Sequence, residues 1–444
     1  MVFLLRAIGF HPALAEYDSS LRQAFEIITG EVTEDAWKQV CLPFSLGGFG
    51  LREASPIASI ALAASAITST KLISTLFRSG PPPPDTVVSE ALAADPMFAT
   101  LPHREEISDA LRHHGFEVPD LETPVSAVAT AGSIQEAAEM VEAEAVAAIA
   151  SVPAAAERED SSSPKLQRIW TRKAERTRFE TICSEASDGG KRLKAFTASH
   201  SSGWLIGASE DEQSSETAFS PSEWLVLARL RLGLPLTERA IPCNICRGRA
   251  LADEFGDHSL KCMFAGCRTR LSNDVRDEVI ALIRAAGYTV SREVRPYPTA
   301  PRARVDFLAT VRGETFSADI AVTHSYLGDP DTYATKVKVA RYGEANAETE
   351  GISLVPMVVD TAGRWCQSAI PLLRRAAVVW GHRHDMRPAR AIPLAFARVN
   401  RVLMRGLARI LLLNLAPDSD PQTGWRVVGA AKTMEPLAVA DEVE

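Results

Sequence analysis

The sequence contains no long run of strongly apolar residues. Its longest weakly apolar stretch, residues 57–77, is interrupted by serines, threonines and Lys71, which predicts a buried helix rather than a membrane span. The N-terminus also lacks the basic region that opens a secretory signal peptide, and Arg6, Gly9 and Pro12 break its apolar run. We therefore expect an intracellular protein with no membrane partner.

Positive charge is in deficit, because 48 lysines and arginines face 56 acidic residues and the formal net charge is −8 at pH 7. This balance argues against a chain that binds nucleic acid over its whole surface. The arginines are concentrated in residues 363–413, which hold ten arginines and a single acidic residue, Asp385. Four of these arginines share one face of a predicted helix: Arg398, Arg401, Arg405 and Arg409. These arginines indicate either a stripe that binds the phosphate backbone of a nucleic acid or an ordinary solvated helix surface.

Composition divides the chain into segments of different character. A chain of 444 residues is long enough for about two to four domains. The predicted segments are a helical region at 1–80, a linker at 81–165, a helical connector at 166–240, a cysteine-rich knuckle at 241–270, an α/β region at 271–362 and an arginine-rich helical region with a disordered tail at 363–444.

Local patterns refine two of these segments. The linker is rich in alanine, glutamate and proline; it predicts a helix at 133–149 and disorder at 154–164. The clearest helix of the connector is predicted at 220–232, with Ser220 or Ser222 as its N-cap and Gly233 as its stop.

The cysteines indicate a metal site. Four of the seven fall within 25 residues of one another, which is not the pattern of a secreted disulfide framework. Cys243 and Cys246 have CxxC spacing, and His258 and Cys262 follow one helical turn apart. A Cys₃His set holds Zn²⁺ tetrahedrally, and a site with all four positions filled is structural. Cys267 is a possible substitute ligand, and the alternative to a metal site is a set of free cysteines near a chance histidine.

Residues 304–323 alternate apolar and polar side chains on both sides of the Arg312-Gly313 dipeptide, which predicts a β-hairpin with a two-residue turn. With that turn the apolar faces of the two strands coincide, and Asp306 lies opposite Asp319 on the other face. Carboxylates about 5 Å apart repel each other unless something compensates. Mg²⁺ would compensate, since it is usually held by one or two carboxylates with phosphate and water. A solvated pair on an exposed hairpin is the alternative.

Hydrophobic periodicity places further elements around the hairpin. They are a helix at 272–286, a strand at 288–294 that carries Glu293, a helix at 331–348 that carries Lys338, and a buried strand at 352–359. The predicted order is therefore αβββαβ, preceded by a mainly helical half and followed by C-terminal helices.

This order, with an aspartate in each strand of the hairpin, resembles the core of the PD-(D/E)xK, or restriction-like, nuclease superfamily. At closer range the chain resembles the C-terminal part of non-LTR retrotransposon proteins, in which a reverse transcriptase is followed by a CCHC zinc knuckle and a restriction-like endonuclease. The similar segments are LPFSLGGFGLR, WLVLARLRLGLPL, CxxC with GDHSLKC, RVD and DIAV separated by twelve residues, KxxRY, and LVPMVVDTAGRW. They cover residues 1–80 and 200–380.

The resemblance implies a Mg²⁺-dependent endonuclease that nicks target DNA in the nucleus for retrotransposition, with element RNA as a further partner. Asp306 and Asp319 would hold the catalytic Mg²⁺, and Glu293 would hold a second metal ion or orient water. Lys338 would stabilise the charged transition state. The alternatives are an exposed helix residue for Lys338 and a surface carboxylate for Glu293.

The chain departs from the family in three ways. Val305 stands where the family has proline, and the lysine usually found two residues after the second acid is absent; Lys338 on the following helix takes that place in this branch. No two aspartates are adjacent anywhere in the chain, so the acidic pair of a reverse-transcriptase active site is missing. We expect a C-terminal fragment without polymerase activity. The alternatives are a non-catalytic nucleic-acid-binding remnant and a non-functional relic.

Overall fold

The computed structural model describes most of the chain between residues 11 and 415. The described ranges are 11–76, 104–113, 166–188, 190–198, 200–205, 219–325, 329–347 and 351–415, together with Leu92, Phe98, Leu101, Phe116, Val118 and Thr349. The helix predicted at 133–149, the disorder predicted at 154–164 and the predicted C-terminal tail lie outside these ranges. The chain divides into two compact units, residues 1–24 with 51–181 and residues 25–50 with 182–444.

The described part of the first unit is helical. The helices that lie in it wholly or in part are α2 (Ala13–Thr29), α4 (Ser55–Leu76), α6 (Arg104–His113) and α8 (Leu166–Glu185). Asp18 caps α4, because its carboxylate accepts hydrogen bonds from the backbone N–H groups of Ala54 at 2.6 Å and Ser55 at 2.9 Å. α4 confirms the helix predicted at 57–77. Among the described residues, no helix is both long and apolar enough to cross a membrane.

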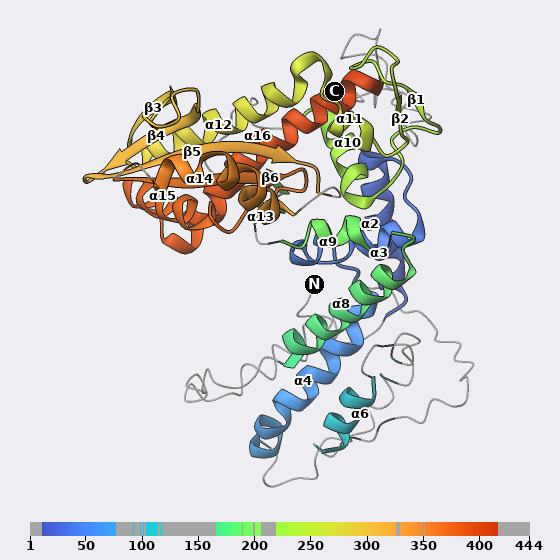
Figure 1. Cartoon of the computed structure of the whole chain (residues 1–444). Coiled ribbons are helices and arrows are strands. Elements are labelled where there is room, and N and C mark those ends of the chain that lie inside the picture. The colour runs from blue at the N-terminus through green and yellow to red at the C-terminus, as the bar shows by residue number, and fades with distance from the viewer. Residues whose placement is uncertain are drawn as a thin grey trace, which may run out of the picture. The chain divides into compact units, whose positions relative to one another are not determined.

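The second unit contains the sheet predicted around the hairpin (Figure 1). Its strands, in spatial order, are β3 (Thr289–Val294), β4 (Val305–Val311), β5 (Glu314–Thr323) and β6 (Ile352–Asp360). β4 is antiparallel to both β3 and β5, and β6 joins parallel to β5. The unit is therefore mixed α/β, with a small sheet and many helices, and the predicted strand at 352–359 joins the sheet of the hairpin as β6.

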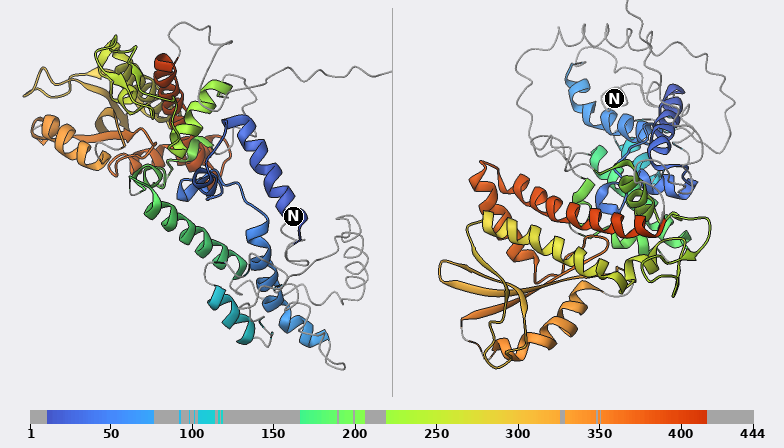
Figure 2. Two further views of the ribbon diagram at one scale, coloured as in Figure 1. Left: turned by 90° about the vertical axis from the view of Figure 1, so that its right-hand side faces the viewer. Right: turned by 90° about the horizontal axis from the view of Figure 1, so that it is seen from above.

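Helices lie on both sides of this sheet (Figure 2). On one side, α12 (Cys267–Ala285) packs with α15 (Ile370–Arg383) and α16 (Pro388–Leu415), and the apolar face of the hairpin, including Phe307 and Phe316, is buried in their core. On the other side lie α13 (Pro330–Tyr333), a π-helical segment (Ala334–Val339) and α14 (Ala340–Ala347), which contact β6. The polar face of the hairpin is turned toward this second layer.

The hairpin has the predicted register from Phe307, opposite Ala318, to its turn. The ladder ends at Phe307 and Ala318, one position short of Asp306 and Asp319. The sequence predicted that the two aspartates lie directly opposite each other, but they are beyond the last paired position of the two strands. Oδ2 of Asp306 instead accepts a hydrogen bond from the N–H of Ile320 at 2.6 Å. A carboxylate thus takes the place of a backbone carbonyl at the end of the ladder.

Two helices differ from their predicted form. α12 begins at Cys267, which is five residues before the predicted start at Ser272. The helix predicted at 331–348 forms as α13, the π-helical segment and α14 in succession. π-Helical turns are rare and often occur at functional sites. The segment that carries Lys338 is the π-helical one.

α10 (Pro221–Leu232) has the ends predicted from the sequence: Ser220 caps its start, and Gly233, with φ of 65°, ends it. A buried arginine of α10, Arg231, donates a hydrogen bond to the carbonyl oxygen of Gly48 at 2.9 Å. Burial lowers the pKa of Arg231 to about 9. This contact holds the glycine-rich segment around Gly48 against α10.

Candidate functional site

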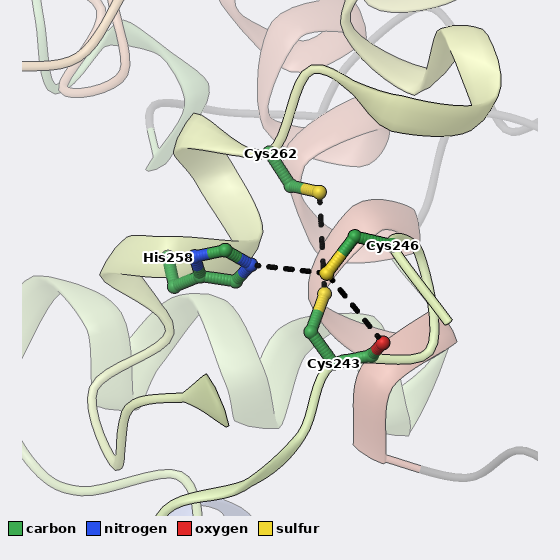
Figure 3. Close-up of side chains that lie close together, drawn as sticks. All are labelled: Cys243, Cys246, His258 and Cys262. Atoms are coloured by element: carbon green, nitrogen blue, oxygen red, sulfur yellow. Dashed lines mark hydrogen bonds between the residues drawn. The ribbon is translucent and has the colours of Figure 1, made fainter. Parts of the chain in front are cut away.

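The predicted metal ligands come together in the knuckle that contains β1 (Ile241–Pro242), β2 (Leu251–Ala252) and α11 (Asp257–Lys261). Figure 3 shows Cys243, Cys246, His258 and Cys262 pointing toward one another. Each offers one ligand atom, and these atoms all lie within 4.8 Å of one another.

The distances within this cluster suit a tetrahedral metal ion. The Sγ atoms of Cys243 and Cys262 are 4.0 Å apart, and Sγ of Cys246 lies 3.7 Å from Nε2 of His258. Zinc at about 2.3 Å from each sulfur would separate two sulfurs by about 3.8 Å. The donor set therefore fits a metal ion such as zinc. Cys267, the alternative ligand, is buried at the start of α12 and is not part of the cluster.

Asp253 fixes the direction of α11, a role that the sequence did not suggest. Its carboxylate accepts hydrogen bonds from the backbone N–H groups of Phe255, Asp257 and His258, at 3.1, 3.0 and 2.6 Å. Burial alone would raise the pKa of Asp253, but these donors hold it below its usual value. The Asx-type turn that starts α11 thereby orients His258 toward the cysteines.

The predicted carboxylates and lysine meet at the end of the hairpin away from its turn. Nζ of Lys338, from the π-helical segment, lies 2.5 Å from Oδ2 of Asp319 on β5 and 3.4 Å from the carbonyl oxygen of Ile320. The Lys338 and Asp319 side chains are each only 10% exposed. Lys338 is therefore not the exposed helix residue that was the alternative interpretation.

Asp306 lies beside this ion pair. Burial, followed by the negative charge of Asp319, raises the pKa of Asp306 to about 6. The same surroundings raise the pKa of Tyr342 on α14 to about 12, with burial as the largest cause and Asp319 as the next. A cation at this position would face an excess of negative charge that Lys338 alone does not cancel.

Arg276 on α12 is a site residue that the sequence analysis missed. It is 9% exposed, and its Nη1 atom lies 2.8 Å from Oε1 of Glu293 and 3.8 Å from Oδ1 of Asp306. The sequence could have indicated this role, because Arg276 lies among the apolar positions of the helix, between Val275 and Val279. A buried arginine on such a stripe indicates an acidic partner.

Glu293 is an exposed carboxylate, as the alternative interpretation has it, with 42% of its side chain accessible, and it is already paired. Its Oε1 and Oε2 atoms each lie 2.8 Å from a guanidinium nitrogen, the first from Arg276 and the second from Arg304. Its backbone has a φ of 55°, unusual for a residue with a side chain. These ion pairs engage both oxygens that the predicted second metal ion or water would need.

The loop between β3 and β4 is anchored beside the carboxylates. The hydroxyl of Tyr297 lies 2.6 Å from Oγ of Ser317, which is on the same face of β5 as Asp319, and the hydroxyl of Tyr342 donates to the carbonyl of Arg304 at 3.0 Å. Tyr297 and Tyr342 are buried. The loop also carries two exposed arginines, Arg295 and Arg302, for which the described parts of the chain provide no ion-pair partner.

Three arginines of the α16 stripe lie near carboxylates of the same chain, although the side chain of Arg409 stays 65% exposed. Arg398 forms an ion pair with Glu278 at 2.7 Å. Arg405 and Arg409 lie 3.9 and 3.8 Å from a carboxylate oxygen of Glu223. These contacts favour a structural role for the stripe over a phosphate-binding one.

Comparisons with known proteins identify no relative: no protein-family model matches the chain, and neither does any curated protein. The function is therefore argued from the side chains. Two clusters carry that argument, the Cys₃His cluster of the knuckle and the group formed by Asp306, Asp319 and Lys338.

Proposed function

We propose that the chain is a Mg²⁺-dependent DNA endonuclease that nicks target DNA, built as the C-terminal part of a non-LTR retrotransposon protein with a restriction-like core. The observation that carries the proposal is the meeting of Asp319 and Lys338 in a buried ion pair beside Asp306, from β5, the π-helical segment and β4. Residues far apart in the sequence supply these groups, and an acidic pair beside a lysine suits phosphodiester hydrolysis.

The oxygen atoms at the site suit a small hard cation. Oδ1 of Asp306 makes no contact shorter than 3.8 Å with a cation among the described residues, and the carbonyl of Ile320 lies at the same end of β5. Mg²⁺ held by Asp306, Asp319 and the Ile320 carbonyl would activate water and neutralise charge on the phosphate. Burial and the neighbouring charge of Asp319 raise the pKa of Asp306, and a bound cation would offset that concentration of negative charge.

The chain's own residues would have separate roles. Nζ of Lys338 contacts the Asp319 carboxylate, so its ammonium group would lie beside a phosphate held there by Mg²⁺ and would stabilise the negative charge that develops on it. Arg276 would hold Glu293 and restrain Asp306. The anchored β3–β4 loop would present Arg295 and Arg302 to the DNA backbone, next to the reacting phosphate.

A second candidate function is nucleic-acid binding without catalysis. It is favoured by the ion pairs themselves, because Lys338 already neutralises Asp319, and Arg276 and Arg304 already neutralise Glu293. A decayed active site would keep such pairs, because losing one partner leaves the other charge uncompensated. The zinc knuckle and the β3–β4 loop would then remain as the nucleic-acid contacts.

Nicking of supercoiled plasmid separates the two functions. We expect conversion to the open-circular form with Mg²⁺, none with EDTA, and none with Asp319→Asn, whose side chain keeps its size but loses its charge. The matched control is Asp385→Asn, an exposed aspartate after α15. Nicking by the Asp319→Asn variant at the wild-type rate would exclude the proposed site. Binding of DNA without Mg²⁺-dependent nicking would favour the second function.

A further inference from the structure

The end of α16 lies against the Cys₃His cluster. In Figure 3 the pale red ribbon of α16 passes behind Cys243 and Cys246. Asn414, in the last turn of this helix, is 2% exposed. A carboxamide buried this deeply must form hydrogen bonds to offset its lost contacts with water.

Asn414 connects the two halves of the metal site. Its Oδ1 atom accepts hydrogen bonds from the backbone N–H groups of Asn244 at 2.7 Å and Ile245 at 3.4 Å, the two residues between Cys243 and Cys246. Its Nδ2 atom donates to Oγ of Ser259 at 2.6 Å. Ser259 directly follows His258 and is buried.

The orientation of the Asn414 carboxamide follows from its partners. Backbone N–H groups can only donate, so the atom facing Asn244 and Ile245 must be the oxygen, and the nitrogen must then face Ser259. One side chain thus fixes both the CxxC turn and the helix that carries His258.

The contact is reciprocal. Nδ2 of Asn244 lies 3.3 Å from the carbonyl oxygen of Leu413 and 3.2 Å from that of Asn414. Carbonyl groups in the last turn of a helix have no partner within the helix. The CxxC turn therefore caps α16, while α16 fixes the CxxC turn.

We propose that Asn414 is a positioning residue of the metal site and that the last turn of α16 forms together with that site. The inference rests on the knuckle holding a metal ion, and it is independent of the endonuclease function. Asn414 would hold the Cys243–Cys246 segment and His258 at the separation a tetrahedral ion requires. Its partners are the immediate neighbours of the ligands, and losing an outer-shell residue that orients metal ligands typically weakens metal binding by about 10- to 100-fold.

Zinc affinity, measured by competition with a chromophoric chelator, tests this role. Asn414→Leu, of similar size but without hydrogen bonds, should weaken zinc binding by about 10- to 100-fold. Asn414→Asp keeps the oxygen acceptors, and Ser259 can reverse its bond and donate, but it buries a charge, so its zinc affinity should lie between those of Asn414→Leu and the wild type. The d–d spectrum of bound Co²⁺ should also shift in Asn414→Leu, because the ligands are no longer held in the same geometry.

Asn400→Leu is the matched control. Asn400 is also buried in α16, where it accepts from Nε1 of Trp365 at 3.2 Å and donates to the carbonyl of His200 at 2.8 Å. It should lower stability without changing zinc affinity. Equal losses of zinc affinity in Asn400→Leu and Asn414→Leu would show a general effect of destabilisation and would overturn the proposal, as would unchanged affinity in Asn414→Leu.

Hydrogen exchange of the wild-type protein provides a test that does not depend on a variant folding. Removal of zinc should abolish protection of the amides in the last turn of α16, near Leu413 and Asn414, and leave the middle of the helix protected. Equal protection with and without zinc would contradict the coupling. A wild-type chain that binds no zinc would refute both the metal site and the positioning role, whatever the plasmid assay shows.

Discussion

Lys338 and Asp319 form an ion pair at 2.5 Å in which both side chains are 10% exposed. A buried ion pair does not by itself stabilise a protein, because both charges have lost their contacts with water. Breaking such a pair from one side leaves an uncompensated charge, which typically costs about 3–5 kcal/mol. The pair therefore links the stability of the core to the proposed chemistry, and the two effects can be measured separately.

Lys338→Met should slow nicking by about 100- to 1,000-fold, the usual effect of losing one electrostatic stabiliser of the transition state. It should also lower the free energy of unfolding, since Asp319 stays buried without its cation. The double variant with Asp319→Asn should recover stability while remaining inactive. Chemical denaturation and the plasmid assay on the same preparations provide both measurements. Recovery of nicking in the double variant would contradict the assigned roles.

Asp306 should make the protein less stable as the pH rises from about 4 to about 6. Its pKa is raised from an ordinary 3.8 to about 6 in the folded state, so in this window the folded chain holds a proton that the unfolded chain has released. The stabilisation from that proton is complete at a pH below the pKa of Asp306 in the unfolded chain. It is lost as the pH rises past the pKa of Asp306 in the folded chain. The loss amounts to at most about 3 kcal/mol.

Denaturation in EDTA at several pH values checks this expectation. Asp306→Asn cannot titrate but keeps an oxygen to accept from the N–H of Ile320. The difference in unfolding free energy between wild type and variant should therefore shift in favour of the variant as the pH increases. Parallel curves for the two proteins would show that Asp306 has an ordinary pKa.

Removing the metal ion from the knuckle should unfold the region around residues 241–262. Structural zinc contributes on the order of 10 kcal/mol to the folding of small zinc-binding units. Metal analysis should give about one zinc per chain, and chelation should expose the thiols of Cys243, Cys246 and Cys262 to a thiol reagent. Cys366, buried in the core beside β6, is an internal control that should stay protected. Full thiol reactivity before chelation would contradict a bound metal.

Arg295 and Arg302 should contribute to DNA affinity through the phosphate backbone. Each phosphate contact changes the slope of log K against log salt concentration by about 0.9, so the double alanine variant should lower that slope by about two. Arg312→Ala, at the exposed turn of the hairpin, is the control and should leave the slope unchanged. Fluorescence anisotropy with a labelled duplex and Ca²⁺ in place of Mg²⁺ measures binding without cleavage. An unchanged slope in the double variant would exclude the loop as a phosphate contact, even if nicking occurs.

The sequence alone determined the features that depend on local periodicity and chain geometry. Strand alternation and the Arg312-Gly313 turn specified the hairpin register, and Ser220 and Gly233 specified the ends of α10, because hydrogen bonds between near neighbours decide both. The spacing of Cys243, Cys246, His258 and Cys262 also predicted the cluster, since a knuckle of this length brings its own ligands together.

Tertiary structure decided which charged groups meet. The π-helical segment places Lys338 against Asp319, α12 brings Arg276 to Glu293 and Asp306, and α16 extends Asn414 to the knuckle. Each contact joins residues that no local pattern relates, and each depends on how helices pack against the sheet. The periodicity of a segment specifies which of its faces is apolar, but only packing specifies which neighbour meets the polar atoms that remain.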